Sequence, residues 1–334
     1  MVALEPNGIP AVSRLGDSAS LSARHAASRI LSLGVSRTYS IGMYAAGPDL
    51  RFGPAPGAHN PVLTSESVTD AVATTVADPF MIRVDGTWHM FFEVVGWRGP
   101  SPRGEIGHAT SPDGLHWTYQ RIVLAEPFHV SFPYVFVSGP DVYMIPESWE
   151  SGSVRLYRGD PFPSRWTLVA ELLRGPVLLD ACPFERDGRW WMPVTTSLQN
   201  DSLRLFVAPD LLGPWREHPQ SPLISGDNHC ARAAGRVLAD GDRLIRFAQE
   251  CDATYGKRVR AFEITRLDAE GYEERELRPE PILRESGDGW NAAGMHQIDP
   301  HPRGDGTWLA CVDGWADARW PRRAVRGLKR LTKR

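Results

Sequence analysis

Cysteine, excess charge and long apolar runs are all scarce in this chain of 334 residues. Its four cysteines (Cys182, Cys230, Cys251 and Cys311) are scattered without a CxxC spacing, so the sequence indicates neither a zinc site nor a disulfide framework. The 37 basic and 40 acidic residues leave a formal charge of -3, which gives no electrostatic reason to bind nucleic acid. No stretch resembles a secretion signal or is long enough to cross a bilayer. We therefore expect a cytoplasmic protein with buried free thiols.

What the chain does contain is glycine, proline and aromatic residues. Its 31 glycines, 28 prolines and 12 tryptophans are typical of a turn-rich β protein. An Asp-Gly turn or a close equivalent, followed by a strand of alternating aromatic and aliphatic residues, occurs five times, at residues 85–92, 139–145, 187–192, 240–245 and 305–310. The glycines of successive copies are 53, 49, 53 and 65 residues apart, which is the period of a propeller blade rather than of a helical solenoid.

A five-bladed β-propeller is the fold that this repeat predicts. Each copy has the pattern of a small antiparallel sheet, with an inner strand, a return strand and a third strand that ends in a turn and an aromatic residue. The fifth copy lacks the third strand, but residues 40–45 resemble residues 105–110 of the first copy. We predict that this N-terminal strand closes the last blade, because a closed ring leaves no exposed sheet edge. The all-β propeller is expected to span residues 39–315.

The two ends of the chain differ from the repeat. Residues 1–38 are rich in alanine and serine, and we expect a partly ordered arm with a short helix at residues 22–31. Residues 316–334 form a basic tail, with eight lysines and arginines and no acid from Arg319 to Arg334. One interpretation is a solvated tail, and the other is weak contact with an anionic membrane surface or polymer.

Charged residues recur at one position of the repeat. The inner strand and its return strand form a hairpin, so the residue before the first and the residue after the second lie at the same end. The residues at these positions include Asp78, Glu93, Glu147, Asp180, Arg232, Glu250 and His296. Carboxylates beside apolar strands are costly to bury unless they are paired or solvated. They form either a structural charge network with Arg232 and Arg236 or a site for a polyhydroxylated ligand.

Several segments resemble known propellers. Residues 77–80 (Ala-Asp-Pro-Phe) and 86–92 resemble the first-blade motif of five-bladed glycosidases such as glycoside hydrolase family 43 and the invertases. A closer resemblance, over about residues 40–315, is to the N-terminal propeller domain of the glucosamine inositolphosphorylceramide transferases, which also occurs as stand-alone bacterial proteins. The segments that carry it are residues 104–111, 126–136, 143–148, 249–251 and 255–256. No transferase domain is expected after Arg334, so the resemblance implies a propeller without the transferase activity.

The glycosidase resemblance implies roles for particular carboxylates. In those enzymes an Asp at the start of the first blade is the base, and an Asp at the start of the third blade orients and tunes the acid. Asp78 and Asp180 match these two positions. The acid is a Glu of the fourth blade, but this chain has Arg232 at the start of that blade and Glu250 at the end of the same hairpin. Hydrolysis needs a carboxyl group that stays protonated, and Glu147 and Glu250 are both candidates.

Two functions are consistent with these residues. One is a glycosidase-like enzyme acting on a surface glycan or glycolipid sugar, and the other is a non-catalytic glycan-binding propeller that assists a glycosyltransferase. The candidate ligand contacts are Glu93, Trp97, His129, Arg232, Arg236, Tyr255 and His296. The arginines suit an anionic sugar or a phosphate, and Trp97, expected in a loop, is placed to stack on a sugar ring. No cofactor is expected; His296 and Asp299 could contribute to a structural ion, but no ligand spacing requires a metal.

Overall fold

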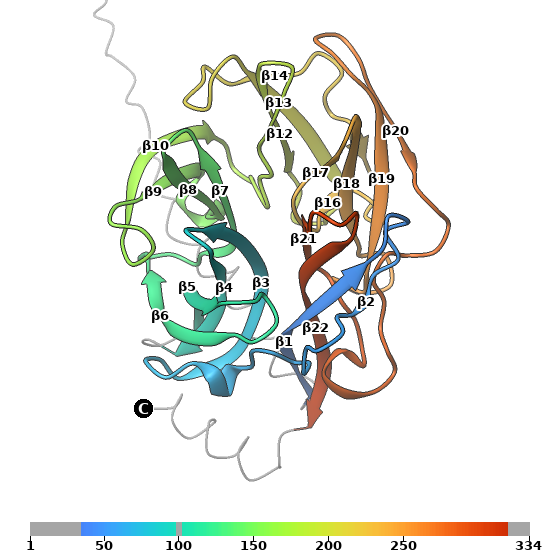
Figure 1. Ribbon diagram of the computed structural model, residues 1–334. Helices are drawn as coiled ribbons and strands as arrows, with labels where there is room; N and C mark the ends of the chain where they lie inside the picture. The colour runs from blue at the N-terminus through green and yellow to red at the C-terminus, as the bar shows by residue number, and fades with distance from the viewer. Residues whose placement is uncertain (1–34, 98–101, 320–334) are drawn as a thin grey trace, which may run out of the picture. The chain divides into compact units, whose positions relative to one another are not determined.

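Five antiparallel sheets surround a common axis in the computed structural model, which describes residues 35–97 and 102–319 (Figure 1). Each sheet is one blade, so the five-bladed propeller predicted from the repeat is confirmed. The predicted arm before residue 35, its helix at residues 22–31 and the basic tail after residue 319 lie outside the described residues. Within the described part of the chain, no helix has the length and apolar character needed to span a membrane.

The first two blades have long inner strands that lead into tight turns. Asp85 and Gly86, at the first turn, have positive φ angles of 49° and 81°, the left-handed backbone that two-residue hairpins use. The strands of blade I are β3 (Ala73–Val84), β4 (Thr87–Trp97), β5 (Pro102–Ser111) and β6 (Thr118–Leu124), and those of blade II are β7 (Ser131–Ser138), β8 (Asp141–Glu147), β9 (Ser153–Gly159) and β10 (Trp166–Arg174).

Blades III and IV have interrupted inner strands. In blade III an isolated bridge between Leu179 and Thr195 precedes the inner strand, and in blade IV residues 234–237 separate two short inner strands. The strands of blade III are β11 (Phe184–Arg186), β12 (Arg189–Thr195), β13 (Ser202–Ala208), β14 (Arg216–Glu217) and β15 (Ile224–Ser225), and those of blade IV are β16 (Arg232–Ala233), β17 (Leu238–Asp240), β18 (Arg243–Glu250), β19 (Arg258–Leu267) and β20 (Tyr272–Glu276).

Blade V combines strands from the two ends of the described chain. Its inner strand β21 (Ile298–Pro302) pairs with β22 (Trp308–Arg319), and β22 pairs with the N-terminal strand β1 (Val35–Ala46), followed by β2 (Gly53–Pro54). The N-terminal strand therefore closes the last blade, as the sequence predicted. Residues Arg37–Asp317 form one compact unit. Short 3-10 turns complete the connections: η1 (Ser65–Ser67), η2 (Trp149–Ser151) and η3 (Gly289–Asn291).

Three inner strands change direction at the same end of the propeller. The pairing register shifts between Ala77 and Phe80 in β3, where Asp78 has a φ of 52°. Phe132 in β7, at a similar register shift, has a φ of 45°, and Asp180 before β11 has a φ of 50°. Positive φ is tolerated by Asp but is strained for Phe. Because bulges redirect side chains, these residues turn away from the regular alternation of their strands.

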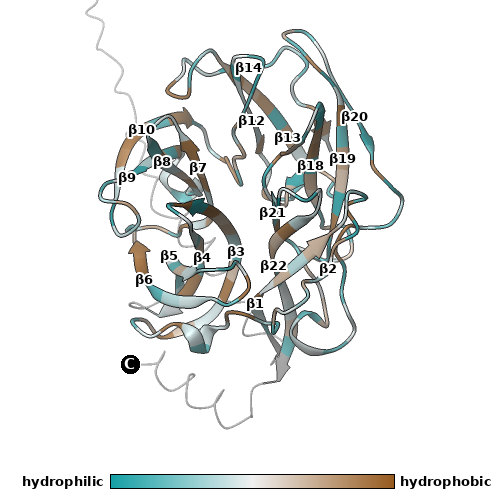
Figure 2. Ribbon diagram, in the orientation of Figure 1, coloured by the Kyte–Doolittle hydropathy of each residue, from teal (hydrophilic) through white to brown (hydrophobic). Residues whose placement is uncertain are grey.

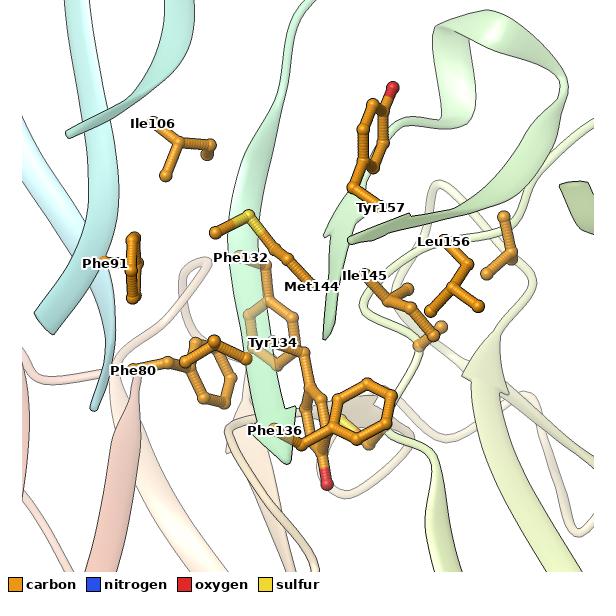
Figure 3. Packing of buried hydrophobic residues seen from close by; sticks show 14 of the residues in the cluster. Phe80, Phe91, Ile106, Phe132, Tyr134, Phe136, Met144, Ile145, Leu156 and Tyr157 are labelled. Carbon is orange, nitrogen blue, oxygen red and sulfur yellow. The ribbon is translucent and has the colours of Figure 1, made fainter. Parts of the chain in front are cut away.

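The blades are held together by apolar clusters between neighbouring sheets. In the cluster shown in Figure 3, Phe80 of β3 packs edge-on against Phe132 of β7, with ring centroids 4.8 Å apart, and against Tyr134 at 5.4 Å. Burying apolar surface is worth roughly 25 cal/mol per Å². Each buried aromatic ring therefore stabilises the contact between the blades by about a few kcal/mol. Figure 2 shows apolar residues along the strands and many hydrophilic residues in the loops.

Candidate functional site

A cavity of about 300 Å³ lies at the end of the propeller where the inner strands bulge. Its size is at the lower end of the range of small-ligand sites. Its charged lining residues come from four blades: Asp78, Glu93, His129, Glu147, Arg232 and His296. Apart from Thr75 and Ser131, the remaining wall is aromatic or aliphatic and includes Tyr39, Trp149, Leu179, Leu198 and Tyr255. Polar groups that converge beside aromatic rings suit a ligand with many hydroxyl groups and an apolar ring face.

Glu147, the last residue of β8, is a buried acid whose hydrogen-bond donors in the described part of the chain are neutral groups. Its side chain accepts hydrogen bonds from the Ser131 hydroxyl at 3.3 Å and the Trp149 backbone N–H at 2.9 Å. The residue is only 5% exposed, and this burial raises the pKa of Glu147 to about 7. Neutral donors stabilise the carboxylate less than a positive charge would. Glu147 therefore holds a proton near neutral pH at the wall of the cavity.

Asp78 lies at the bulge of β3 and is tied to both neighbouring blades. One carboxylate oxygen accepts the Phe132 N–H of blade II at 3.3 Å, and the Asp78 backbone N–H donates to Asp313 of blade V at 2.9 Å. Burial raises the pKa of Asp78, and the His296 ring, 3.4 Å from its other oxygen, opposes that rise. The left-handed backbone at Asp78 thus places a carboxylate where strands of three blades meet.

His296 lies between two carboxylates. Its Nδ1 is 2.6 Å from Asp313, and its Nε2 is 3.4 Å from Asp78. Burial lowers the pKa of His296, but the charge of Asp313 outweighs burial and raises this pKa to about 9. The donor atoms of Asp78, His296 and Asp313 lie within 4.8 Å of one another. With its pKa raised to about 9, the ring carries a proton on each nitrogen at neutral pH and can pair with both acids, whereas a metal ion would need a lone pair on one of these nitrogens. Asp299, considered with His296 for an ion, pairs instead with Arg236 and His301.

His129 and Glu93 form a second pair at the cavity wall. The Nε2 of His129 is 2.9 Å from Glu93, and the Gly104 N–H donates to Nδ1 at 3.0 Å. Burial disfavours the charged ring and Glu93 favours it, raising the pKa of His129 to about 9. The Gly104 N–H needs a lone pair on Nδ1, however, and this contact selects the neutral ring with its proton on Nε2. In this form His129 accepts the Gly104 N–H and donates from Nε2 to Glu93, so it orients that carboxylate.

Arg232 reaches the cavity with most of its donors already used. Its guanidinium binds Asp180 through two nitrogens, at 2.7 and 3.3 Å, and donates to Asn200 at 2.7 Å. It also lies 5.0 Å from the centre of the Tyr255 ring. Asp180 is 2% exposed and lies behind Arg232 rather than at the cavity wall. The start of blade IV therefore presents a neutralised cation.

Four of the predicted site residues lie outside the cavity lining: Asp180, Glu250, Arg236 and Trp97. Glu250 is bound by Arg258 at 3.2 Å and by Arg260 at 2.8 Å. Arg236 binds Asp299 of blade V at 2.7 Å and the Val135 carbonyl of blade II at 2.9 Å, so it crosses the axis and does not line the cavity wall. Trp97, expected in a loop, is the last residue of β4 and is 38% exposed.

Some lining residues had little signal in the sequence. Tyr39 reaches the cavity because β1 closes blade V, and its ring lies 4.9 Å from that of His296. Leu198 comes from the loop after β12 and is 53% exposed. Trp149, two residues after Glu147, could have been found from the repeat, because it follows the end of a return strand. The first two depend on contacts between blades that no local pattern describes.

Comparisons with known proteins agree with this architecture. Residues 53–315 match the family described as glucosamine inositolphosphorylceramide transferase 1, N-terminal. The chain is 34% identical over 265 residues to glucosamine inositolphosphorylceramide transferase 1 of Oryza sativa subsp. japonica, with 76% of this chain and 35% of that protein covered. The protein of the same name from Arabidopsis thaliana is 33% identical over 267 residues, covering 76% and 34%. The chain thus spans about a third of the length of these curated relatives.

Solved structures share the fold at low sequence identity. The catalytic domain of a Coprinopsis cinerea GH62 α-L-arabinofuranosidase has a TM-score of 0.54 and 14% identity, covering 83% of this chain and 97% of that one. An exo-β-1,3-galactanase from Clostridium thermocellum has a TM-score of 0.51 and 15% identity, covering 64% and 51%. These likenesses support the five-bladed architecture. By its matched family and its relatives, the chain belongs to the glucosamine inositolphosphorylceramide transferase 1 N-terminal family.

Proposed function

We propose that the cavity binds a sugar and that the protein is a glycosidase-like enzyme acting on a surface glycan or glycolipid. The observation that carries this proposal is the contrast between two acids on one cavity. Glu147 is buried beside neutral donors, and burial raises its pKa to about 7. Burial also raises the pKa of Asp78, but this carboxylate faces the ring of His296 at 3.4 Å, which favours its ionised form. Glycoside hydrolysis needs such a pair, one carboxyl group protonated and the other ionised.

Each cavity residue then has a role in the proposed reaction. Glu147 gives its proton to the glycosidic oxygen as the bond to the anomeric carbon breaks. Asp78 accepts a proton from the water whose oxygen bonds to that carbon, so the charges balance over the two acids. Trp149 and Tyr255 offer ring faces on which a sugar can stack. Arg232 fixes the blade IV side of the cavity through its bond to Asp180.

A second function is favoured by the geometry of blade IV. The position where the glycosidase resemblance calls for an acid holds Arg232, and the nearby Glu250 is bound by two arginines. A propeller with this arrangement suits a glycan-binding module that assists a glycosyltransferase. The curated relatives are transferases by name, and this chain covers about a third of their length. A partner glycosyltransferase and a cytoplasmic location remain predictions under either function.

Substitutions at the two acids test the choice. The full chain, Asp78→Asn and Glu147→Gln would be assayed against a panel of aryl and natural glycosides, with binding measured on a glycan array. We expect each variant to lose turnover while Glu147→Gln still binds sugar, because its amide keeps the shape of the acid. If the native chain binds sugars but neither substitution changes any turnover, the enzyme assignment is wrong and the binding function is retained.

A further inference from the structure

Asp313 is a buried carboxylate that the proposed reaction does not use directly. It lies in β22, the strand paired with the closing strand β1, and it has no exposed surface. Its Oδ1 accepts the backbone N–H groups of His296 at 3.2 Å and Gln297 at 3.1 Å, and it lies 2.6 Å from His296 Nδ1. Its Oδ2 accepts the Asp78 N–H at 2.9 Å. One side chain therefore joins the last blade to the first beside the cavity.

These contacts fix the orientation of the His296 ring. Because Nδ1 of His296 contacts Asp313, its Nε2 points at Asp78. A carboxylate behind an imidazole generally directs the opposite ring nitrogen toward a site in this way. Tyr39 and Tyr255 cover the ring, with centroids 4.9 and 5.5 Å from its own. The ionisable groups around His296 include Asp78, Asp313, Asp180, Arg232, Tyr39 and Tyr255. Two of them are acids in direct contact, and one is a cation already bound to Asp180.

We propose that Asp313 is a positioning residue that keeps His296 as an imidazolium against Asp78, so that Asp78 stays ionised at the buried mouth of the propeller. The reason is the cost of a bare carboxylate at that place, since Asp78 is 7% exposed and otherwise accepts one backbone N–H at 3.3 Å. An adjacent imidazolium offsets that cost. The catalytic meaning of the charge rests on the proposed function, but the ionic state of the cluster does not.

The experiment follows the ring nitrogens of His296 in the full chain by heteronuclear NMR from about pH 5 to about pH 9, with His296→Asn assigning the resonance. We expect both nitrogens to carry protons throughout the neutral range in the native protein. In Asp313→Asn the negative charge is gone, and we expect the pKa of His296 to fall by about 2. A native His296 that is neutral at pH 7, or one that titrates alike in both proteins, would overturn the proposal.

Asp299→Asn is the matched control. Asp299 is equally buried, lies in the same blade and also accepts bonds from a cation, a histidine and a backbone N–H, those of Arg236, His301 and Met81. This variant should lose stability without changing the titration of His296. If Asp313→Asn does not fold, the native titration decides the proposal alone. Added calcium or magnesium chloride is a further check, because a cation that displaced a ring proton of His296 would make the cluster a metal site and overturn the assignment.

The two proposals fail in different ways. A protein whose His296 titrates as expected but which hydrolyses no glycoside keeps the role of Asp313 and loses the enzyme function. If hydrolysis is found, Asp313→Asn should move the acidic limb of the kcat profile, because the pKa of Asp78 responds both to the charge of His296 and to that of Asp313 itself. A uniform loss of kcat with an unmoved limb would show that Asp313 is only structural.

Discussion

Glu147 and Glu250 end equivalent strands of two blades, yet the structure gives them opposite surroundings. Both are the last residue of a return strand, β8 and β18, and both are almost fully buried, at 5% and 4% exposure. Glu147 receives a hydroxyl and a backbone N–H, whereas Glu250 receives two guanidinium groups. Equal burial therefore does not give equal surroundings, because the donors around each carboxylate come from different strands.

The difference comes from the third strand of each blade. In blade IV the register places Arg258 of β19 directly opposite Glu250, and Arg260 follows two residues later on the same face. In blade II, β8 pairs with β9 at Tyr143 and Met144, which lie four and three residues before the end of β8. Glu147 therefore lies beyond the part of β8 that pairs with β9. There its side chain lines the cavity and does not contact a cation of β9.

The largest expected effect is on turnover. If Glu147 is the general acid, Glu147→Gln should lower kcat by roughly 10² to 10⁴, the usual contribution of a positioned proton donor. The loss should be smaller for aryl glycosides with good leaving groups, because these need less protonation. Steady-state kinetics on both substrate classes measure it. Glu250→Gln is the control, and a loss of turnover with the same leaving-group dependence in that variant would remove the distinction between the two acids.

The next effect is on stability, and here the Glu250 variant should show the larger change. Glu250→Gln leaves Arg258 and Arg260 without a shared acid, although each keeps another partner, Glu285 and Glu276. We expect the free energy of unfolding to fall by about 3 kcal/mol, the lower end for breaking a buried ion pair. Urea unfolding measures this loss. Glu147→Gln should change the same quantity far less, and equal losses would show that both acids are structural.

A third effect is the pH dependence of the reaction. Since burial raises the pKa of Glu147 to about 7, the active acid form is lost above that pH, and turnover should fall about tenfold for each further pH unit. Because the pKa of Glu147 is higher in the folded chain than in the unfolded chain, the folded chain binds this proton more tightly. The contribution of this proton to the free energy of unfolding is therefore lost as pH rises toward 7. Glu250→Gln should keep the alkaline limb. A native profile that stays flat through pH 8 would contradict the role of Glu147.

The smallest effect concerns one hydrogen bond. The Ser131 hydroxyl donates to Glu147 at 3.3 Å, and this contact favours the ionised form. Ser131→Ala should therefore raise the pKa of Glu147 further and move the alkaline limb up by less than one pH unit, since such a bond is worth about 1 kcal/mol. Ser148→Ala is the control, because the Ser148 hydroxyl donates to the Ser153 carbonyl instead. A shift of the limb to lower pH would reverse the assigned direction.

The repeat was enough to predict the architecture, because hairpin turns and strand alternation are local. The Asp85-Gly86 turn has the left-handed backbone that its sequence requires, and the strand at residues 40–45 joins the last blade as expected. That Asp78 lies near Glu93 also followed from its place in the repeat, although Asp78 lies within β3 and not before it as predicted. Its bulge and its contact with Asp313, 235 residues away, did not, because they depend on the closure of the ring.

The sequence by itself determined the five blades, the closing strand and the set of acids near one end of the propeller. Only the tertiary structure decided which of these acids are at the cavity and which carry a proton. The physical reason is that a pKa depends on burial and on charges a few ångströms away. For Glu147 and Asp78, those charges come from other strands and other blades.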